Sequence, residues 1–403
     1  MTSNADLMTM ASKAFTANMR PASVVFERGK GCRLWDVEGR EYLDLCAGIA
    51  VVSVGHSHPT LVSAIQDQCA HLMHVSNLFF NDKVIALAKA ITERTCFDRV
   101  YFSNSGTEAI EGLIKLARRY QYEQGRPERT ELIAADRSFH GRTLGALSLT
   151  GQPKYHVGMS PLVPGVAFVP FGDLDALVRA IGPNTAAVFL EPIQAEGGIF
   201  EGSQAYLQGV RQVCTEHQVL LFFDEVQTGY GRTGRFLAQE WTGVEPDGCA
   251  LAKGMGGGFP IGGIAVKEFL KDGLPPGSHA TTFGGNALAC AAGLAVLKIF
   301  DDDKILDNVQ RVGAHLSQAL QRLCSTLPSG RVIEQRGRGL LQGLALSSDV
   351  DPLATLGKIR EKGVLLSIAG GSVLRFSPPL VVTEAEIDEG LQVVQSVLSQ
   401  PEA

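Results

Sequence analysis

The sequence has no apolar run long enough to cross a membrane, no closely spaced pair of cysteines and no excess of positive charge. A transmembrane helix needs roughly 18–20 consecutive apolar residues, and no stretch of this sequence reaches that length. The net charge is −6, whereas nucleic-acid-binding domains are usually basic. These absences argue against a membrane protein and against a nucleic-acid-binding protein.

The cysteines are scattered, and none belongs to a C-x-x-C pair. That spacing is typical of zinc ribbons and thioredoxin-like redox sites, so we predict neither and expect no metal site. Isolated cysteines in apolar surroundings are typical of reduced core residues in a cytosolic protein. The first 20 residues also lack the apolar segment of a secretory signal. We therefore expect a cytoplasmic protein.

The composition is that of a globular protein, with 45% hydrophobic and 19% charged residues. Disordered chains have fewer apolar residues and a larger net charge. A length of 403 residues indicates two or three domains, or one large α/β domain with a smaller appendage. The 45 glycines follow no G-X-Y period, which excludes collagen. They cluster in short loops, where the backbone must approach something closely.

Apolar strands and amphipathic helices alternate through the middle of the chain. Residues 219–223 are continuously apolar, as expected of a strand that is buried on both faces of a mostly parallel sheet. The alternation predicts a doubly wound α/β domain. The predicted strands are 99–103, 131–135, 186–190, 219–223, 250–252 and 263–266, and the predicted helices are 107–124 and 204–217.

The two ends of the chain show other patterns. Residues 27–45 alternate short apolar and polar runs, which predicts a small β-meander. Near residues 287–300 a long apolar helix begins, and an acidic break follows it. A helix at 306–323 and strands at 339–345 and 373–376 then predict a separate α+β domain.

Three features are expected at the carboxyl edge of the predicted sheet, where ligands bind in open α/β folds. Strand 219–223 leads to Asp224, whose buried charge needs a partner. Residues 248–252 lead to Lys253, which is set among glycines, and a buried lysine can form a Schiff base. The turn at 102–107 places hydroxyl groups and a glycine at a helix N-terminus, which can bind phosphate.

Taken singly, these features have ordinary alternatives, namely a solvent-exposed lysine and a plain helix cap. Taken together, an amine, a carboxylate and an anion site are what pyridoxal 5'-phosphate requires. We therefore predict a site for this cofactor.

Sequence motifs in a fixed order extend this prediction over nearly the whole chain. They are RLWD (33–36), GHSHP (55–59), SNSGTEA (103–109), FHGRT (139–143), EPIQ (191–194), DEVQTG (224–229), AKG (252–254), TTFGGN (281–286) and RFSPP (375–379). This series resembles the class III (ω-amino) aminotransferases, which are pyridoxal-phosphate enzymes of fold type I. The resemblance implies a large doubly wound domain of residues 55–294 with a mixed, mostly parallel sheet. It also implies a smaller α+β domain built from both chain ends, residues 1–54 and 295–403.

By this resemblance, Lys253 carries the cofactor and then moves protons, and Asp224 pairs with the pyridine nitrogen. Thr282 serves the cofactor of the neighbouring subunit, so the resemblance implies a homodimer with shared active sites. His140 is expected to support its loop. The further cofactor-binding residues that the resemblance implies are Ser105, Gly106, Thr107, Phe139, Glu225, Val226 and Gln227.

The substrate-binding residues that the resemblance implies are Ile49, Arg142, Glu196, Thr281 and Arg375. Arginine suits carboxylates because its planar fork binds them through two hydrogen bonds. Arg375 is expected to bind the α-carboxylate of glutamate, and Arg142 its distal carboxylate. When the donor presents a terminal amine, Glu196 is expected to pair with Arg375 and neutralise its charge.

Ile49 stands where ornithine enzymes carry a tyrosine, and an apolar residue suits an α-nitrogen that is already acetylated. The resemblance thus implies transamination of N2-acetyl-L-ornithine with 2-oxoglutarate, giving N-acetyl-L-glutamate 5-semialdehyde and L-glutamate, in arginine biosynthesis. Succinylornithine, N-succinyldiaminopimelate, ornithine and 4-aminobutyrate are the alternative donors. A pyridoxal-phosphate aminomutase, a racemase or a non-catalytic regulator is an alternative of another class. The Arg375 and Glu196 switch argues against the first two. Intact Lys253, Asp224 and Arg142 argue against the third.

Overall fold

A seven-stranded sheet forms the centre of the computed structural model, which describes residues 3–19, 21–328 and 330–400. Neighbouring strands pair in parallel, except that β12 is antiparallel to both β4 and β11. In spatial order the strands are β4 (Arg99–Ser103), β12 (Gly262–Val266), β11 (Gly248–Leu251), β10 (Leu220–Asp224), β7 (Thr185–Leu190), β5 (Glu131–Ala135) and β6 (Val166–Val169).

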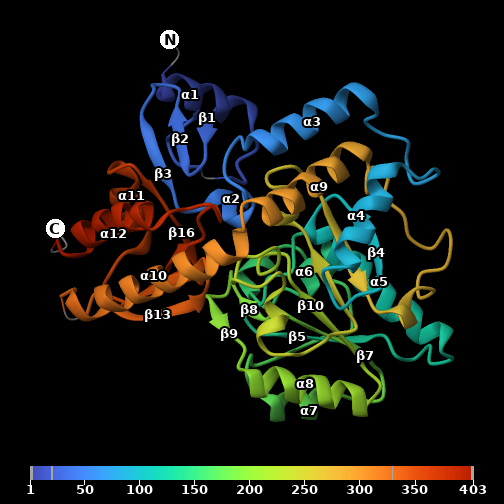
Figure 1. The fold of residues 1–403 in the computed structure, drawn as a ribbon. Coiled ribbons are helices and arrows are strands. Elements are labelled where there is room, and N and C mark those ends of the chain that lie inside the picture. Colours follow the sequence, from blue (N-terminus) through green and yellow to red (C-terminus); the bar gives the residue numbers. More distant parts are fainter. Residues whose placement is uncertain (1–2, 20, 329, 401–403) are drawn as a thin grey trace.

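Helices cover both faces of this sheet (Figure 1), and β10 shows why its sequence is apolar throughout. Successive side chains of a strand point to opposite faces. Leu220 and Phe222 belong to one buried cluster with residues of α5, whereas Leu221 and Phe223 belong to another with residues of α8. The helices of this region are α3 (Pro59–His71), α4 (Asp82–Thr92), α5 (Gly106–Glu123), α6 (Leu144–Ser148), α7 (Leu174–Ala180), α8 (Gln204–Glu216) and α9 (Ala287–Asp302).

Both ends of the chain contribute to one small sheet. Strand β3 (Glu41–Asp44) pairs in parallel with β15 (Val364–Leu365), and the sheet continues through β2 (Arg33–Asp36) to β1 (Phe26–Lys30). In Figure 1 the blue N-terminal elements accordingly lie beside the red C-terminal ones. This arrangement agrees with the predicted small domain. The division at residues 54 and 294 stays a prediction, and residue 294 falls inside α9.

A second small sheet belongs to the C-terminal part alone, with the order β13-β14-β17-β16. Its strands are β13 (Val332–Arg338), β14 (Leu341–Leu346), β17 (Val373–Phe376) and β16 (Ser367–Ala369), and its helices are α10 (Ile305–Thr326), α11 (Pro352–Glu361) and α12 (Glu384–Leu398). The remaining elements are α1 (Asn4–Ala14), α2 (Ala47–Ala50), β8 (Ile193–Gln194), β9 (Phe200–Glu201), η1 (Pro153–Tyr155), η2 (Ala238–Trp241), η3 (Lys253–Gly256) and η4 (Glu268–Leu270).

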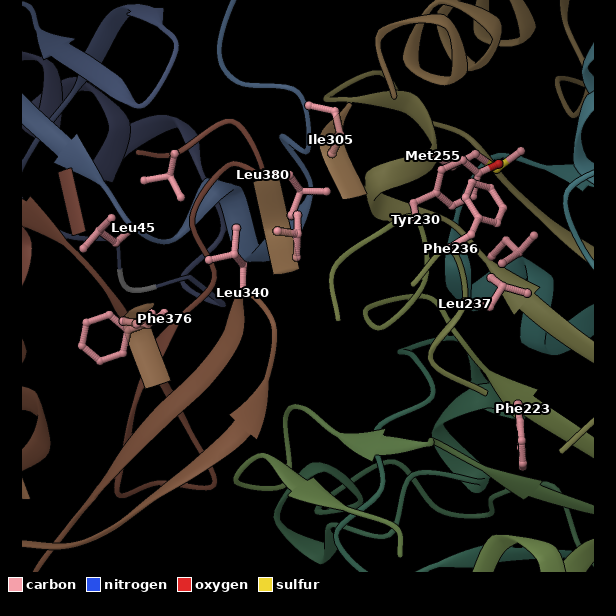
Figure 2. Close-up of a cluster of buried hydrophobic side chains, with 14 of the residues drawn as sticks. Leu45, Phe223, Tyr230, Phe236, Leu237, Met255, Ile305, Leu340, Phe376 and Leu380 are labelled. Carbon is pink, nitrogen blue, oxygen red and sulfur yellow. The ribbon is translucent and has the colours of Figure 1, made fainter. Parts of the chain in front are cut away.

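A continuous apolar core joins the small sheets to the large one. Figure 2 shows Phe223 of the large sheet and Tyr230, which follows it, in the same cluster as Leu45, Phe376 and Leu380 from the two chain ends. Burial of this shared surface fixes the position of the small sheets over the carboxyl end of the large one. No helix in the described part of the chain has the length and apolar character needed to cross a bilayer.

Candidate active site

A cavity of about 410 Å³ opens where several strands of the large sheet end. Its walls come from the residues that directly follow β4, β7, β10 and β11 and from the loop after β5. The carboxyl edge of an open α/β sheet is the expected place for a ligand. The structure brings nine of the predicted site residues together there: Ser105, Gly106, Thr107, Phe139, Arg142, Asp224, Val226, Gln227 and Lys253.

Asp224, at the end of β10, is 6% exposed and is held from two sides. Its Oδ1 accepts a hydrogen bond from the Val226 amide at 3.0 Å. Its Oδ2 lies 2.8 Å from Nδ1 of His140, a fully buried side chain whose Nδ1–H is therefore the donor. The Nε2 atom of His140 has no hydrogen-bond partner among the described residues. The carboxylate is thus fixed in orientation at the cavity wall.

Lys253 comes after β11, the strand that pairs with β10. Burial lowers the pKa of Lys253 from 10.5 to about 8, and the negative charge of Glu196 acts in the opposite direction. A lysine with such a pKa is neutral in a substantial fraction of molecules near pH 8, and the neutral amine is the nucleophile. Lys253 can therefore react as a nucleophile with the carbonyl group of a bound compound.

The N-terminus of α5 forms the anion-binding part of the cavity. Ser105 caps the helix and accepts from the Glu108 amide, so the ordinary capping role is present. A Cβ atom at Gly106 would lie 2.8 Å from Val226 Cγ1, which means that only glycine allows this approach. Thr107 Oγ1 accepts from the amides of Arg142 and Thr143, each at 3.2 Å. The free N–H groups and the positive end of α5 suit a phosphate.

Arg142 faces the same cavity from the loop after β5. Its guanidinium lies 3.8 Å from the centroid of the Tyr155 ring and 5.4 Å from that of Phe139. Stacking of this kind holds the planar fork in a fixed plane. The side chain is thus oriented for a carboxylate.

Arg375 on β17 is 1% exposed and forms an ion pair with Glu196, with Nη1 and Oε1 2.5 Å apart. Gln227 joins the two, because it donates to Glu196 at 3.2 Å and accepts from Arg375 at 3.1 Å. Burial alone would raise the pKa of Glu196, but the charges of Arg375 and Lys253 hold that pKa below its usual 4.5. The arginine is therefore masked by an ionised carboxylate beside the cavity.

Six predicted residues lie outside the cavity lining, namely the paired Glu196 and Arg375 and four others. Thr281 is adjacent to it, because its hydroxyl accepts from Asn104 at 3.0 Å. Ile49 in α2 is 43% exposed, and Thr282 is exposed in the loop before α9. Glu225 points away and accepts from the amides of Ala238 and Gln239, and burial raises its pKa to about 7. The surroundings of Glu225 favour a structural role.

Glu191 is a buried cavity residue that is not among the predicted site residues. It follows β7 directly, and its Oε2 accepts from the Phe139 amide at 3.1 Å. Burial, and then the charge of Asp224, raise the pKa of Glu191 well above 4.5. The sequence does point to Glu191, because a carboxylate comes at the end of an apolar strand there, as it does at Asp224. The contact of His140 with Asp224 joins residues 84 positions apart and has no such signal.

The comparison with known proteins identifies the family. The class-III aminotransferase family model matches residues 14–398. The chain belongs to the class-III aminotransferases. This result confirms the predicted enzyme class and the predicted fold.

Curated relatives in this family cover nearly the whole chain. The acetylornithine aminotransferase of Caldanaerobacter subterraneus is 48% identical over 386 residues, which are 96% of each protein. A protein of Pseudomonas aeruginosa named succinylornithine transaminase/acetylornithine aminotransferase is 44% identical and covers 93% of this chain and 92% of its own length.

Solved structures of aminotransferases share the fold. The ornithine aminotransferase of Toxoplasma gondii has a TM-score of 0.95 at 35% identity, covering 99% of this chain and 95% of its own. The acetylornithine aminotransferase of Elizabethkingia anophelis has a TM-score of 0.87 at 30% identity, covering 99% of both chains. A second structure of the Toxoplasma enzyme is described with partial occupancy of PLP at its active site.

Proposed function

We propose that this aminotransferase transfers the terminal amino group of N2-acetyl-L-ornithine to 2-oxoglutarate, giving N-acetyl-L-glutamate 5-semialdehyde and L-glutamate in arginine biosynthesis. The observation that carries the proposal is the buried Arg375–Glu196 ion pair beside Lys253. An α-amino acid needs the arginine free, whereas a donor that reacts at a terminal amine has no carboxylate for it. Relatives named acetylornithine aminotransferase support the choice of donor.

The cofactor of the proposed reaction is pyridoxal 5'-phosphate, and the residues of the cavity fit it. Lys253 would hold it through the amine, and Asp224 would pair with the pyridine nitrogen, oriented by His140. The amides at the start of α5, including Gly106 and Thr107, would hold the phosphate. Gly106 lies so close to Val226 that a Cβ atom would not fit. Such a glycine is typical of a backbone segment that approaches a bound anion closely. When bound, this cofactor withdraws electrons from the substrate and carries the amino group between the two substrates.

The two arginines would bind different carboxylates of the two substrates. Arg142 would bind the carboxylate of the donor and the distal carboxylate of 2-oxoglutarate, since both lie far from the reacting carbon. Arg375 would bind the carboxylate next to the reacting carbon of 2-oxoglutarate, after Glu196 moves away. The neutral Lys253 amine would take the proton from the reacting carbon and return it. Glu191 would hold the Phe139 amide throughout.

Two further properties are proposed with this function. The protein is a cytoplasmic homodimer, and Thr282 completes the cofactor site of the partner subunit. The exposure of Thr282 outside the cavity lining of its own chain supports this assignment.

A donor panel tests the proposed function. Purified protein with pyridoxal 5'-phosphate and 2-oxoglutarate receives N-acetylornithine, N-succinylornithine, N-succinyldiaminopimelate, ornithine or 4-aminobutyrate, and the glutamate formed is measured. We expect N-acetylornithine to give the highest kcat/KM and Lys253→Ala to form no glutamate while keeping its circular dichroism spectrum. A tenfold preference for another donor would reassign the substrate, and an active Lys253→Ala variant would overturn the role of the lysine.

A further inference from the structure

Ser53 is a buried residue that joins the C-terminal part of the chain to the loop of Lys253. It is 1% exposed. Its hydroxyl donates to the carbonyl oxygen of Gly254 at 2.8 Å. Its own carbonyl oxygen accepts from the Leu380 amide at 2.7 Å. One small residue thus connects the segment that follows Arg375 with the residue next to Lys253.

The segment that leads to Ser53 has an unfavourable backbone that its neighbours hold in place. Ala47, Gly48, Ile49 and Ala50 all have a positive φ, between 50° and 66°. For a residue other than glycine this region costs about 1–2 kcal/mol, so the turn persists only if surrounding contacts fix it.

Those contacts come from the carboxylate of Asp44 and from the C-terminal part of the chain. Asp44 accepts from the amides of Cys46 and Ala47 at 2.9 and 2.8 Å and contacts His56 at 2.7 Å. The Ser377 hydroxyl donates to the Cys46 carbonyl at 3.0 Å. The path of the chain to Ser53 is therefore fixed, and the Ser53 hydroxyl has little freedom to leave Gly254.

Lys253 itself has a left-handed backbone, with φ of 42°. Its neighbour Gly254 is packed closely, because a Cβ atom there would lie 3.2 Å from Tyr230 Cβ and 3.5 Å from Ser53 Cβ. The hydrogen bond from Ser53 holds the Gly254 carbonyl, which belongs to the peptide bond between Gly254 and Met255, one peptide beyond the one that follows Lys253. Two backbone hydrogen bonds also hold this turn, from the Met255 amide to the Ala252 carbonyl at 3.0 Å and from the Gly257 amide to the Gly254 carbonyl at 3.3 Å. The Ser53 hydroxyl adds a side-chain donor that ties the turn to a distant segment of the chain.

We propose that Ser53 is a positioning residue for Lys253. The Ser53 hydroxyl keeps the lysine backbone in the conformation that directs the amine into the cavity. The role rests on the proposed function of Lys253. The ionisable groups around the amine are Glu196, Arg375, Asp224 and Glu191. Ser53 carries no charge, so loss of its hydroxyl changes the proton affinity of the amine only by moving it.

The test is Ser53→Ala, read by the titration of the Lys253 amine. In the full-length chain without cofactor, acetic anhydride labels neutral lysine, and mass spectrometry of the Lys253 peptide over a pH series gives the midpoint. Because burial is the main cause of the lowered pKa of Lys253, we expect the labelling midpoint to rise by about half to one pH unit. We also expect both half-reactions to slow about tenfold.

Thr242→Ala is the matched control, since it also removes a buried hydroxyl that donates to a carbonyl, that of Gln239 at 2.9 Å. It is expected to lower the melting temperature and leave the labelling midpoint unchanged. A Ser53→Ala variant with the wild-type midpoint would overturn the positioning role even if its melting temperature falls. If Ser53→Ala does not fold, Ser53→Cys replaces it, and its labelling midpoint must also rise, by less than the rise expected for Ser53→Ala. A Ser53→Cys variant with the wild-type midpoint would overturn the role.

The two proposals fail in different ways. Wild-type protein that neither binds pyridoxal 5'-phosphate nor forms glutamate from any donor defeats the proposed function. An active wild type whose labelling midpoint does not respond to Ser53→Ala defeats only the role of Ser53.

Discussion

Single residues of the cavity differ in charge because each meets a different combination of burial and neighbouring charge. Burial lowers the pKa of Lys253 to about 8, and burial raises the pKa of Glu191. Glu196 is partly buried, and the charges of Arg375 and Lys253 keep its pKa low. An acid with a raised pKa, an acid with a lowered pKa and an amine with a lowered pKa thus coexist within one site, which is the pattern of groups that handle protons.

The lowered pKa of Lys253 predicts a specific dependence of stability on pH. Below pH 8 the folded chain holds a buried ammonium that the unfolded chain exposes to water. Between about pH 8 and 10.5 the folded chain has lost this proton while the unfolded chain still binds it, so the free energy of unfolding rises with pH in that window. Lys253→Met lacks this rise. In the absence of cofactor we expect the stability advantage of Lys253→Met to shrink by about 2–3 kcal/mol between pH 7 and pH 10.

Urea unfolding of the two cofactor-free proteins at several pH values measures this difference. Other lysines and tyrosines titrate equally in both proteins and cancel. A difference between the two free energies that stays constant from pH 7 to pH 10 would contradict the assignment of an unusual pKa to Lys253.

The ion pair of Arg375 with Glu196 predicts that the two half-reactions respond differently to mutation. Arg375→Ala should slow the half-reaction with 2-oxoglutarate and leave that with N-acetylornithine near its wild-type rate, because this donor presents no carboxylate to Arg375. Glu196→Ala should weaken the ω-amine donor and favour α-amino acids, by about 1–3 kcal/mol for a partly buried charge-assisted contact.

Single-turnover spectra of each half-reaction measure these rates. Arg338→Ala, which breaks the more exposed ion pair with Glu201, serves as the control and should change neither rate. Equal slowing of both half-reactions by Arg375→Ala would make Arg375 a structural residue of the C-terminal region.

Site residues differ in how far the sequence alone reveals them. Lys253 and Asp224 follow apolar strands, so the sheet edge and their chemistry predict them together. Glu191 has the same signal and was assigned no role. His140 and Ser53 have none, because their significance comes from contacts with residues 84 and 201 positions away. Only the folded chain brings those partners together.

At the scale of helices and strands, the apolar pattern of the sequence predicts where an element lies in the chain better than it predicts the direction of a strand in the sheet. The predicted strands 99–103 and 131–135 have the bounds of β4 and β5, and the predicted helix 107–124 differs from α5 by one residue at each end. The antiparallel direction of β12 was not specified, since a buried apolar run reads alike in either direction. The left-handed turn of α2 was also unforeseen, because its alanines and isoleucine disfavour it locally and tertiary contacts impose it.

The start of α5 predicts the effect of a single added methyl group. Gly106→Ala places a Cβ atom 2.8 Å from Val226 Cγ1, so either the helix start or the cavity wall must move. We expect the affinity for pyridoxal 5'-phosphate to fall at least about tenfold, at an overpacking cost of about 1–3 kcal/mol. Fluorescence titration of the cofactor-free protein measures this affinity.

Gly357→Ala in α11 is the matched control, because no atom lies within 4 Å of its added Cβ. Replacing glycine by alanine inside a helix should stabilise the chain by about 0.5–1 kcal/mol and leave cofactor affinity unchanged. Wild-type affinity in Gly106→Ala would show that the phosphate is bound somewhere other than the start of α5.

At the scale of the whole molecule, the two chain ends complete a site that the large sheet begins. Lys253 and Asp224 follow strands of the large sheet, whereas Arg375 lies on β17 of the C-terminal sheet and reaches Glu196 beside β8. The shared apolar core holds these parts together (Figure 2). The position of Arg375, which we propose binds the amino acceptor 2-oxoglutarate, therefore depends on how the small sheets pack on the large one.

A second copy of the chain is the last component that the proposed site requires, and complementation tests it. If Thr282 serves the partner's cofactor, Lys253→Ala and Thr282→Ala chains are each defective alone. In a mixed dimer, the Thr282→Ala chain keeps its Lys253 and receives an intact Thr282 from its partner, so one of the two sites is complete. Random pairing makes half of the dimers mixed, and roughly a quarter of all sites should then be active.

The measurement is glutamate formation after the two variants are unfolded and refolded together, with separately refolded variants as the control. Mass spectrometry of intact dimers verifies that chains have exchanged. Activity that stays at the level of the separate variants, despite verified exchange, would mean that Thr282 acts within its own chain or not at all. Its exposure in the loop before α9 would then require another explanation.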